Sequence, residues 1–508
     1  MAGIGAAAAA GAAAPPIALA RDEPSALAYR SAGELVEALA GKEVSSRELV
    51  DAAISRIERL DPKINAVVVR DFERAREVAA AADSALAKGQ RRPLLGLPMT
   101  VKEQFNVVGL PTSWGDRQFW RWYPSTDTLA VQRLKNAGVV ILGKTNVPLH
   151  LTDWQSYNDL FGTTNNPWDF GRGPGGSSGG AAAALAAGFV PLELGADGGG
   201  SLRAPAHFCG VFSHKPSLHL IPQRGAGFPG TPEIPVREDF WVIGPMARSA
   251  ADLALELAVI AGPDEWSEGI GYKLALPPPR HDRLADFRVL VIDRHPLCPT
   301  AASISMALDG LADRLAKKGC QVVRGSSDLP DLAQTTRIYY ELLFAFFSAD
   351  LPPAVQDQVA ATARALSLGD GSLAAAGLRG LTMSHPDWIH ASRIRNGLQA
   401  RWQALFREVD IVLCPPMPTV AFRHDHSPQF ARILDVDGAK VPYFDQAVWA
   451  GIATLNGMPA TTMPIARTEN GLPIGMQIIG GFLDDRTTIA FAGLIEREFG
   501  GFTPPPGF

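Results

Sequence analysis

Two clusters of glycine and serine are the segments of this chain best suited to chemistry. The first, at 171–180, reads Gly-Arg-Gly-Pro-Gly-Gly-Ser-Ser-Gly-Gly and leads directly into an alanine-rich run at 181–187 that favours a helix. Glycine lets a backbone approach another group closely, and a helix N-terminus offers unpaired N–H groups and a positive dipole. The segment is therefore suited to hold an anion or an anionic transition state.

The second cluster, at 197–203, reads Asp-Gly-Gly-Gly-Ser-Leu-Arg and follows a strand-like run from Val190 to Leu194. Three glycines before a serine free successive backbone N–H groups to converge on one point. That is the geometry of an oxyanion hole, which stabilises a tetrahedral intermediate. The order of strand, glycines and serine predicts Ser201 as a nucleophile.

Two other motifs fit the first cluster. Gly171, Gly173 and Gly176 match the dinucleotide fingerprint GxGxxG, but a turn rather than a strand precedes them. Residues 175–179 match the GxSxG nucleophile elbow of esterases, with Ser177 as the nucleophile, although the preceding Arg-Gly-Pro makes a poor strand. Both interpretations remain open as alternatives.

A serine nucleophile needs a base within hydrogen-bond reach. The chain has ten histidines, of which His207 and His214 lie on the segment after Ser201. A lysine is the stronger candidate, because Lys102 ends an apolar, strand-like run that starts at Leu97. To serve as a base, its pKa must fall from about 10.4 by roughly three units, or about 4 kcal/mol, which burial can supply.

These residues resemble the motifs of the amidase signature hydrolases, which use a Ser-cisSer-Lys triad. The resemblance rests on the strand ending at Lys102, on the block at 175–180 and on the cluster at 197–203, and it extends from about residue 30 to about residue 500. It implies an α/β fold in which a large mixed β-sheet is covered by helices on both faces.

The resemblance also implies a role for each residue of the site. Ser201 attacks the carbonyl, and Ser177, on a cis peptide, relays its proton to neutral Lys102 and later protonates the leaving amine. Backbone N–H groups hold the oxyanion, namely those of Gly198, Gly199, Gly200 and Ser201. Three residues support the two loops: Ser178, Asp197 and Arg203. No metal and no organic cofactor is implied.

Periodic patterns around these clusters predict alternating helices and buried strands, which are typical of an α/β protein. Ser45 and Glu48 have the spacing of a capping box before a helix that ends at Asp61-Pro62. A helix at 127–137 ends at Gly138. The other expected elements are strands at 139–142, 287–293, 321–324 and 411–414, and helices at 301–318 and 388–408.

Residues 326–384 show helical patterns without strand signals and include an aromatic cluster at 339–347. The cluster is either a core stripe or the lining of a helical cap over the substrate. The proline-rich stretch at 275–284 is typical of a surface crossing between two halves of a sheet. We therefore expect a single domain over 26–505 with a helical insertion at about 326–405, after a disordered or signal-like tail at 1–25.

Composition excludes several classes of protein. The chain has 508 residues, a formal net charge of −5 and 46% hydrophobic residues, which excludes phosphate-driven nucleic-acid binding, disorder and collagen. Its four cysteines lack a CxxC pair and predict neither a disulfide framework nor a zinc site. The Ala-rich run at 3–20 is broken by Pro15 and Pro16 and is no membrane span. It ends like a signal-peptidase site but lacks a basic start, so we expect a cytoplasmic protein, with export as the alternative.

The sequence thus predicts a serine amidohydrolase that cleaves linear amide-type C–N bonds through an acyl-enzyme on Ser201. Candidate substrates are aryl and alkyl amides, esters and carbamates, so aryl acylamidase and urethanase activities are included. The expected protein is a monomer or homodimer that binds no nucleic acid and no membrane. Two further alternatives are an amidotransferase A-like protein, which acts on a tRNA-bound substrate with partner proteins, and a noncatalytic binding module that kept the fold.

Overall fold

The structure is a computed structural model that describes residues 25–232, 237–349, 351–367 and 369–508. An 11-stranded sheet runs through the chain in the order β1-β3-β2-β6-β8-β7-β14-β15-β11-β9-β10. The strands of its first half are β1 (Val67–Arg70), β2 (Pro98–Lys102), β3 (Val140–Thr145), β6 (Leu192–Asp197), β7 (Phe212–Lys215) and β8 (Val242–Ala247). Those of its second half are β9 (Arg288–Val291), β10 (Gln321–Val323), β11 (Ile411–Cys414), β14 (Ala460–Arg467) and β15 (Pro473–Ile479).

The sheet is mixed, as expected. Strands β2, β3 and β6 pair in parallel, and so do β9, β10 and β11. In the middle of the sheet, the successive neighbours β6, β8, β7, β14 and β15 pair antiparallel. The two halves join where β7 pairs with β14, with Thr461 opposite His214. Two short hairpins lie outside the sheet: β4 (Tyr157–Asn158) with β5 (Gly162–Thr163), and β12 (Ile433–Val436) with β13 (Ala439–Pro442).

Helices cover both faces of the sheet, because successive strand residues point to opposite sides. In β11, Ile411 and Leu413 join one core with the helices α5 (Leu129–Ala137), α8 (Ala250–Ile260), α9 (Ala302–Lys317) and α15 (Asp485–Phe499). Val412 and Cys414 join the opposite core with α10 (Leu332–Ser348), α13 (His385–Glu408) and α14 (Val448–Leu455). Over the first half of the sheet that opposite face is covered by α6 (Gly179–Ala186) and α7 (Arg203–Cys209).

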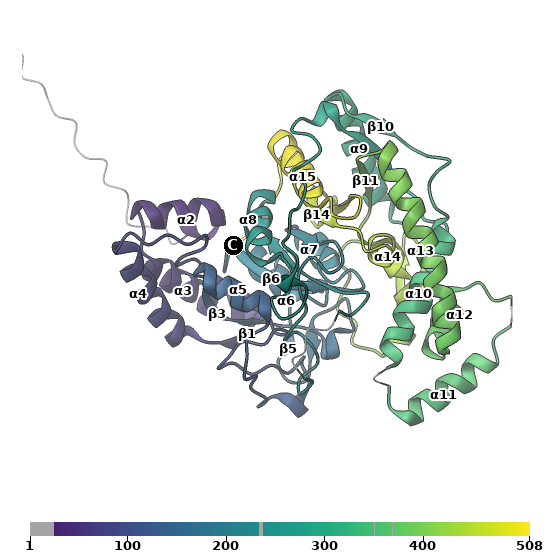
Figure 1. Ribbon diagram of the computed structural model, residues 1–508, viewed down its shortest axis with the longest axis horizontal. Helices are drawn as coiled ribbons and strands as arrows, with labels where there is room; N and C mark the ends of the chain where they lie inside the picture. Colours follow the sequence, from purple (N-terminus) through teal and green to yellow (C-terminus); the bar gives the residue numbers. More distant parts are fainter. Residues whose placement is uncertain (1–24, 233–236, 350, 368) are drawn as a thin grey trace, which may run out of the picture.

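The remaining helices lie at the two ends of the molecule (Figure 1). At one end lie α1 (Ser25–Ala28), α2 (Ala32–Gly41), α3 (Ser46–Ile64) and α4 (Phe72–Ala87). At the other end, α11 (Pro353–Arg364) and α12 (Leu373–Leu381) accompany α10 and α13. The segment 326–384, which the sequence predicts to be helical, therefore does form helices. The division into a tail and one domain stays a prediction, and residues 1–24 of that tail lie outside the described part of the chain. Among the described residues, no helix combines the length and apolar composition needed to cross a membrane.

Local sequence signals explain where most of these elements begin and end. Ser45 and Glu48 form the expected capping box, with the Ser45 hydroxyl accepting from the Glu48 N–H at 3.1 Å. The helix α3 runs on to Ile64 instead of ending at Asp61, because Pro62 falls in the last turn, where its missing N–H removes only one helical bond. Asn65, with a φ of 59°, ends the helix in the left-handed conformation.

Candidate active site

The first glycine-serine cluster forms a tight loop before α6. The Gly176–Ser177 peptide bond is cis, as the resemblance implied. Glycine is required at two positions, because any Cβ there would clash with the backbone. A Cβ added to Gly175, whose φ is +88°, would lie 2.6 Å from the Pro205 Cα, and one added to Gly176 would lie 2.3 Å from the Asp153 carbonyl oxygen. The backbone of the loop is therefore wedged between α7 and the segment before β4.

Lys102 reaches this loop from the end of β2. Met99 and Val101 point into the core beside α5 and α8, so the alternation of the strand turns Lys102 to the other face, toward α6. Its Nζ donates to the Ser177 Oγ at 2.7 Å. The side chain is 1% exposed, and this burial lowers the lysine pKa to about 7 against the opposing attraction of Asp197. Near neutral pH a large fraction of the amine is therefore uncharged.

Ser201 lies two residues before α7 and contacts the first loop next to Ser177. Its backbone carbonyl accepts from the Ser178 N–H at 3.2 Å, which brings the two glycine-serine loops together. Ser177 and Lys102 are buried, whereas Ser201 is partly exposed. The site therefore opens toward solvent at the Ser201 end.

One of the four N–H groups expected to hold the oxyanion already donates within the protein. The Gly200 N–H donates to the Asp197 Oδ1 at 3.0 Å, so that donor is already engaged. Within the described ranges, the N–H groups of Gly198, Gly199 and Ser201 make no hydrogen bond to the protein. Three N–H groups thus remain for an oxyanion.

Asp197 and Arg203 form a fully buried ion pair at the base of this loop, with an Nη2–Oδ1 distance of 2.8 Å. All five guanidinium N–H groups are used, because Arg203 also donates to Ala450, Thr454 and Gln477. Burial by itself raises the Asp197 pKa, but Arg203 and nearby N–H groups lower it to about 2. The pair thus contacts the loop at its base, and the supporting role of both residues stays a prediction.

Serine hydroxyls fasten the cis-peptide loop from both sides. The Ser178 Oγ donates to the Ala196 carbonyl at 3.2 Å, which ties the loop to β6. The Ser156 Oγ donates to the Gly175 carbonyl and accepts from the Gly179 N–H, both at 3.1 Å, so it spans Ser177. Ser178 was expected in this role, whereas Ser156 was not.

Sequence reasoning also missed two aromatic residues at the oxyanion loop. The Trp154 indole N–H donates to the Gly199 carbonyl at 2.9 Å, and the Tyr339 hydroxyl donates to the Gly198 carbonyl at 3.3 Å. Trp154 stands in a loop, and Tyr339 stands in the cluster for which a core stripe and a substrate-lining cap were both open. The only signal in the sequence was the position of Tyr339 in that aromatic cluster.

The alternative bases and motifs find no geometric support. The His207 Nδ1 accepts from the Gly475 N–H at 2.6 Å, and burial lowers the pKa of this histidine to about 4. The His214 ring contacts Asp485 and Thr461. No helix or strand is assigned between β5 and α6, whereas both the dinucleotide fingerprint and the nucleophile elbow need a strand before their loop.

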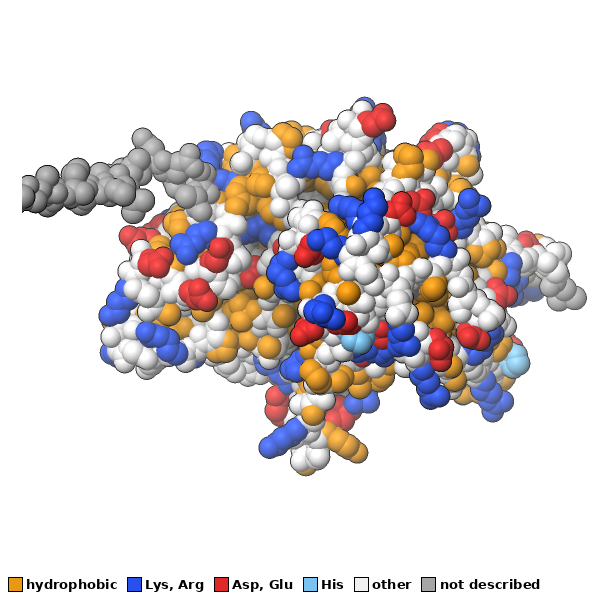
Figure 2. All heavy atoms as spheres, turned by 90° about the horizontal axis from the view of Figure 1, so that it is seen from above, with side chains coloured by type: hydrophobic (Ala, Val, Ile, Leu, Met, Phe, Trp, Pro, Cys, Tyr) orange, Lys and Arg blue, Asp and Glu red, His pale blue; other side chains and the backbone are white. Residues whose placement is uncertain are grey.

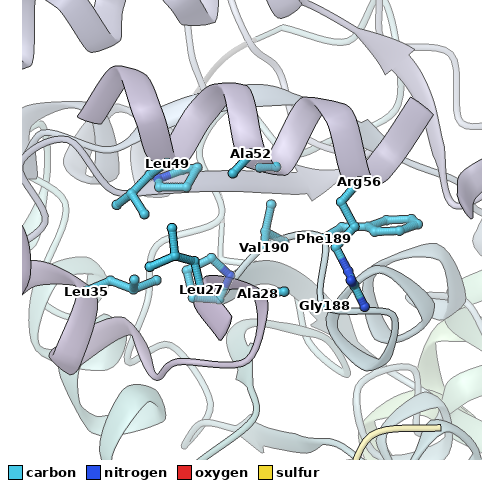
Figure 3. Close-up of a pocket in the computed structure, with 12 residues that line it drawn as sticks. Leu27, Ala28, Leu35, Leu49, Ala52, Arg56, Gly188, Phe189 and Val190 are labelled. Atoms are coloured by element: carbon cyan, nitrogen blue, oxygen red, sulfur yellow. The ribbon is translucent and has the colours of Figure 1, made fainter. Parts of the chain in front are cut away.

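One small cavity lies elsewhere, between α3 and residues 188–191, and Leu27, Leu49 and Phe189 are among the side chains that line it (Figure 3). Its volume is about 30 Å³, which is room for one or two water molecules and far below the roughly 300 Å³ of a ligand pocket. Within the described residues, no group of three or more His, Cys, Asp or Glu side chains is close enough to hold a metal ion.

Comparison with known proteins places this geometry in a family. The family model described as Amidase matches residues 48–489. The chain belongs to the amidase family. Membership of the amidase family, with its signature motifs and mixed sheet, supports hydrolysis of C–N bonds of the amide type.

The names of relatives of this chain include both amidotransferase subunits and amidases. The A-type subunit of the glutamyl-tRNA(Gln) amidotransferase of Roseiflexus castenholzii is 32% identical, with 91% of this chain and 94% of the relative covered. A putative amidase AmiB2 of Mycobacterium tuberculosis is 34% identical, with 93% and 97% covered. A solved bacterial aryl acylamidase of the amidase signature family superposes with a TM-score of 0.77 at 25% identity, with 93% and 97% covered.

Proposed function

We propose that this protein is a serine amidohydrolase with Ser201 as nucleophile, Ser177 as proton relay and Lys102 as base. The observation that carries the proposal is the 2.7 Å hydrogen bond between the Lys102 Nζ and the Ser177 Oγ in a buried site. An amine with a pKa of about 7 can accept a proton from a serine at neutral pH, whereas an ordinary lysine cannot.

We propose the following reaction for this arrangement. The Ser201 hydroxyl attacks the carbonyl carbon while its proton passes to the Ser177 Oγ, and the Ser177 proton passes to Lys102. The N–H groups of Gly198, Gly199 and Ser201 hold the developing oxyanion; Gly200 is left out because Asp197 takes its N–H. The proton then returns through Ser177 to the departing amine, and water hydrolyses the acyl-enzyme by the same steps.

The proposed substrates are linear amides with aryl or alkyl groups, with esters and carbamates as further candidates. Two observations support this choice. The solved aryl acylamidase has a similar fold, and the Trp154 ring lies 3.8 Å from the position of a Cβ on Gly199, so an aromatic ring neighbours the oxyanion loop. We propose that the chain acts as a monomer or homodimer without nucleic acid.

A second candidate function is that of an amidotransferase A-like protein that works with partner chains. The 32% identical relative from Roseiflexus castenholzii favours it. On the face drawn in Figure 2, however, basic and acidic side chains are interspersed, and the formal net charge is −5; a tRNA-binding surface is usually basic. Turnover of a small amide by the isolated chain supports the amidohydrolase, and turnover that requires added partner proteins supports the alternative.

The proposal is tested by labelling with a fluorophosphonate followed by peptide mapping. We expect the label on Ser201 and loss of labelling and turnover in Ser201→Ala and Lys102→Ala, with a trace of activity in Ser177→Ala. Ser84→Ala, on the exposed side of α4, is the control and should behave as the parent protein. Full activity in Lys102→Ala, or a label on Ser177 with active Ser201→Ala, contradicts the relay and supports an esterase of the GxSxG type. An unlabelled, inactive parent protein points to a noncatalytic module.

A further inference from the structure

The loop at 198–201 is held through its carbonyl oxygens. The Gly198 carbonyl accepts from the Tyr339 hydroxyl, and the Gly199 carbonyl accepts from the Trp154 indole. The Gly200 carbonyl accepts from the Ala204 N–H at 2.7 Å. Three successive peptide units are thus anchored on the oxygen side.

The direction of each carbonyl decides the direction of the next N–H. In a trans peptide the C=O of one residue and the N–H of the following residue point in opposite directions across a rigid plane. The bond between Gly198 and Gly199 is trans, since the cis bond of this region is the one before Ser177. When Tyr339 holds the Gly198 carbonyl, it therefore also fixes the direction of the Gly199 N–H, one of the free oxyanion donors.

We infer that Tyr339 is a positioning residue for the oxyanion hole, a role that rests on the proposed function of Ser201. It aims the Gly199 N–H through the Gly198 carbonyl, to which its hydroxyl donates. Because Tyr339 stands on α10, the helical segment is coupled to catalysis by this hydroxyl. Trp154 has the same effect on the next peptide unit, whose N–H already donates to Asp197.

The side chain of Tyr339 is rigid enough for this task. It is completely buried, and a Cβ on Gly451 of α14 lies 2.5 Å from its Cδ1, so the ring is packed against the α14 backbone. Its OH-to-carbonyl distance of 3.3 Å depends on this packing. Removing the hydroxyl leaves the packing intact and frees the peptide unit to rotate.

The adjacent tyrosine provides a matched control. Tyr340 is also buried and donates its hydroxyl to a backbone carbonyl, that of Phe444, at 2.5 Å. That carbonyl does not belong to the loop at 198–201. Tyr339→Phe and Tyr340→Phe therefore remove one OH-to-carbonyl hydrogen bond each from neighbouring positions of one helix.

The experiment measures kcat and KM for an anilide substrate, the inhibition constant of its trifluoromethyl ketone analogue, and the melting temperature. The ketone forms a tetrahedral oxyanion on the nucleophile, so its affinity reports the oxyanion hole. In Tyr339→Phe we expect kcat to fall about tenfold, which is less than the roughly 10²–10³-fold loss of kcat when an oxyanion donor is deleted. KM should stay unchanged, and the inhibition constant should rise by the same factor as kcat falls. Tyr340→Phe should lower the melting temperature to a similar extent and leave kcat and the inhibition constant unchanged.

The inference is overturned if Tyr339→Phe keeps the parent kcat and inhibition constant, or if Tyr340→Phe changes both as much. Should Tyr339→Phe fail to fold, 4-fluorophenylalanine at position 339 fills the space of the hydroxyl without donating a hydrogen bond, and it must show the same loss of kcat and ketone affinity. Activity in Ser201→Ala measured alongside shows that the proposed function itself has failed. Inactive Ser201→Ala with an unaffected Tyr339→Phe shows that only the positioning role has failed.

Discussion

Lys102 is a lysine whose side chain has almost no access to water. Burial disfavours the charged amine, and its pKa falls to about 7. The base works only when it is neutral, so protonation below this pKa blocks the relay. We predict that kcat/KM rises with pH and levels off above an apparent pKa of about 7. A pH–rate profile checks this, and a rise centred where carboxyl groups titrate contradicts a lysine base.

Replacement of Arg203 should destabilise the fold. It neutralises Asp197 inside the protein, where both side chains are 0% exposed. Arg203→Met leaves that carboxylate buried without its partner, and we predict a loss of about 3–5 kcal/mol in the free energy of unfolding. Arg47, which pairs with Asp51 on the exposed side of α3, is the control, and Arg47→Met should cost less than about 1 kcal/mol. Urea denaturation measures both, and equal losses contradict the prediction.

Close approach between α6 and the end of β3 sets the position of the cis-peptide loop. A Cβ added to Gly180 would lie 2.4 Å from the Asn146 backbone nitrogen. No side-chain movement can relieve this clash, because the Asn146 atom belongs to the backbone. We predict that Gly180→Ala lowers the free energy of unfolding by about 1–3 kcal/mol and reduces turnover, because α6 must move away and carry Ser177 from Lys102.

A second glycine within a helix provides the contrast. Gly310, in α9, has nothing within 4 Å of its Cβ position and is exposed. Gly310→Ala should raise the free energy of unfolding by about 0.5–1 kcal/mol, because alanine loses less backbone entropy in a helix. Urea midpoints and turnover of both variants check the pair, and a stable, fully active Gly180→Ala contradicts the close approach.

At the scale of the whole molecule, the sheet has two halves, and residues that accompany both halves contact the loop that carries Ser201. The halves meet along β7 and β14, and Arg203 of the first half donates to Ala450, Thr454 and Gln477 of the second. The linker predicted at 275–284 does cross between the last strand of one half and the first strand of the other. We expect chain continuity at this crossing to contribute less to the site than the contacts between the halves.

We predict that a site-specific protease sequence inserted between Lys273 and Leu274, both exposed, can be cut without loss of activity. The two pieces should elute together in gel filtration, because their shared strand pairing and buried Arg203 contacts outweigh the loss of one connection. The uncut insertion variant is the control. Separation of the pieces, or loss of turnover on cutting, contradicts the idea that the contacts hold the site together.

The sequence by itself determined the alternation of helices and strands, the mixed α/β class and the two loops that carry Ser177 and Ser201, together with the strand that ends at Lys102. These features depend on local rules: periodicity decides which face of a strand is buried, and glycine marks the places where a backbone must pass closely. The end of α3 was missed by a few residues, since a proline in a last turn is tolerated.

Only the tertiary structure decided how the oxyanion loop is held. Trp154, Ser156 and Tyr339 come from segments far from Gly198 in the sequence, and no local pattern distinguishes them from ordinary core or loop residues. It likewise showed that Asp197 accepts from the Gly200 N–H. Of the four N–H groups expected to hold the oxyanion, three therefore remain. A hydrogen bond between distant segments depends on the path of the whole chain, so it becomes visible only when the sheet and its covering helices are assembled.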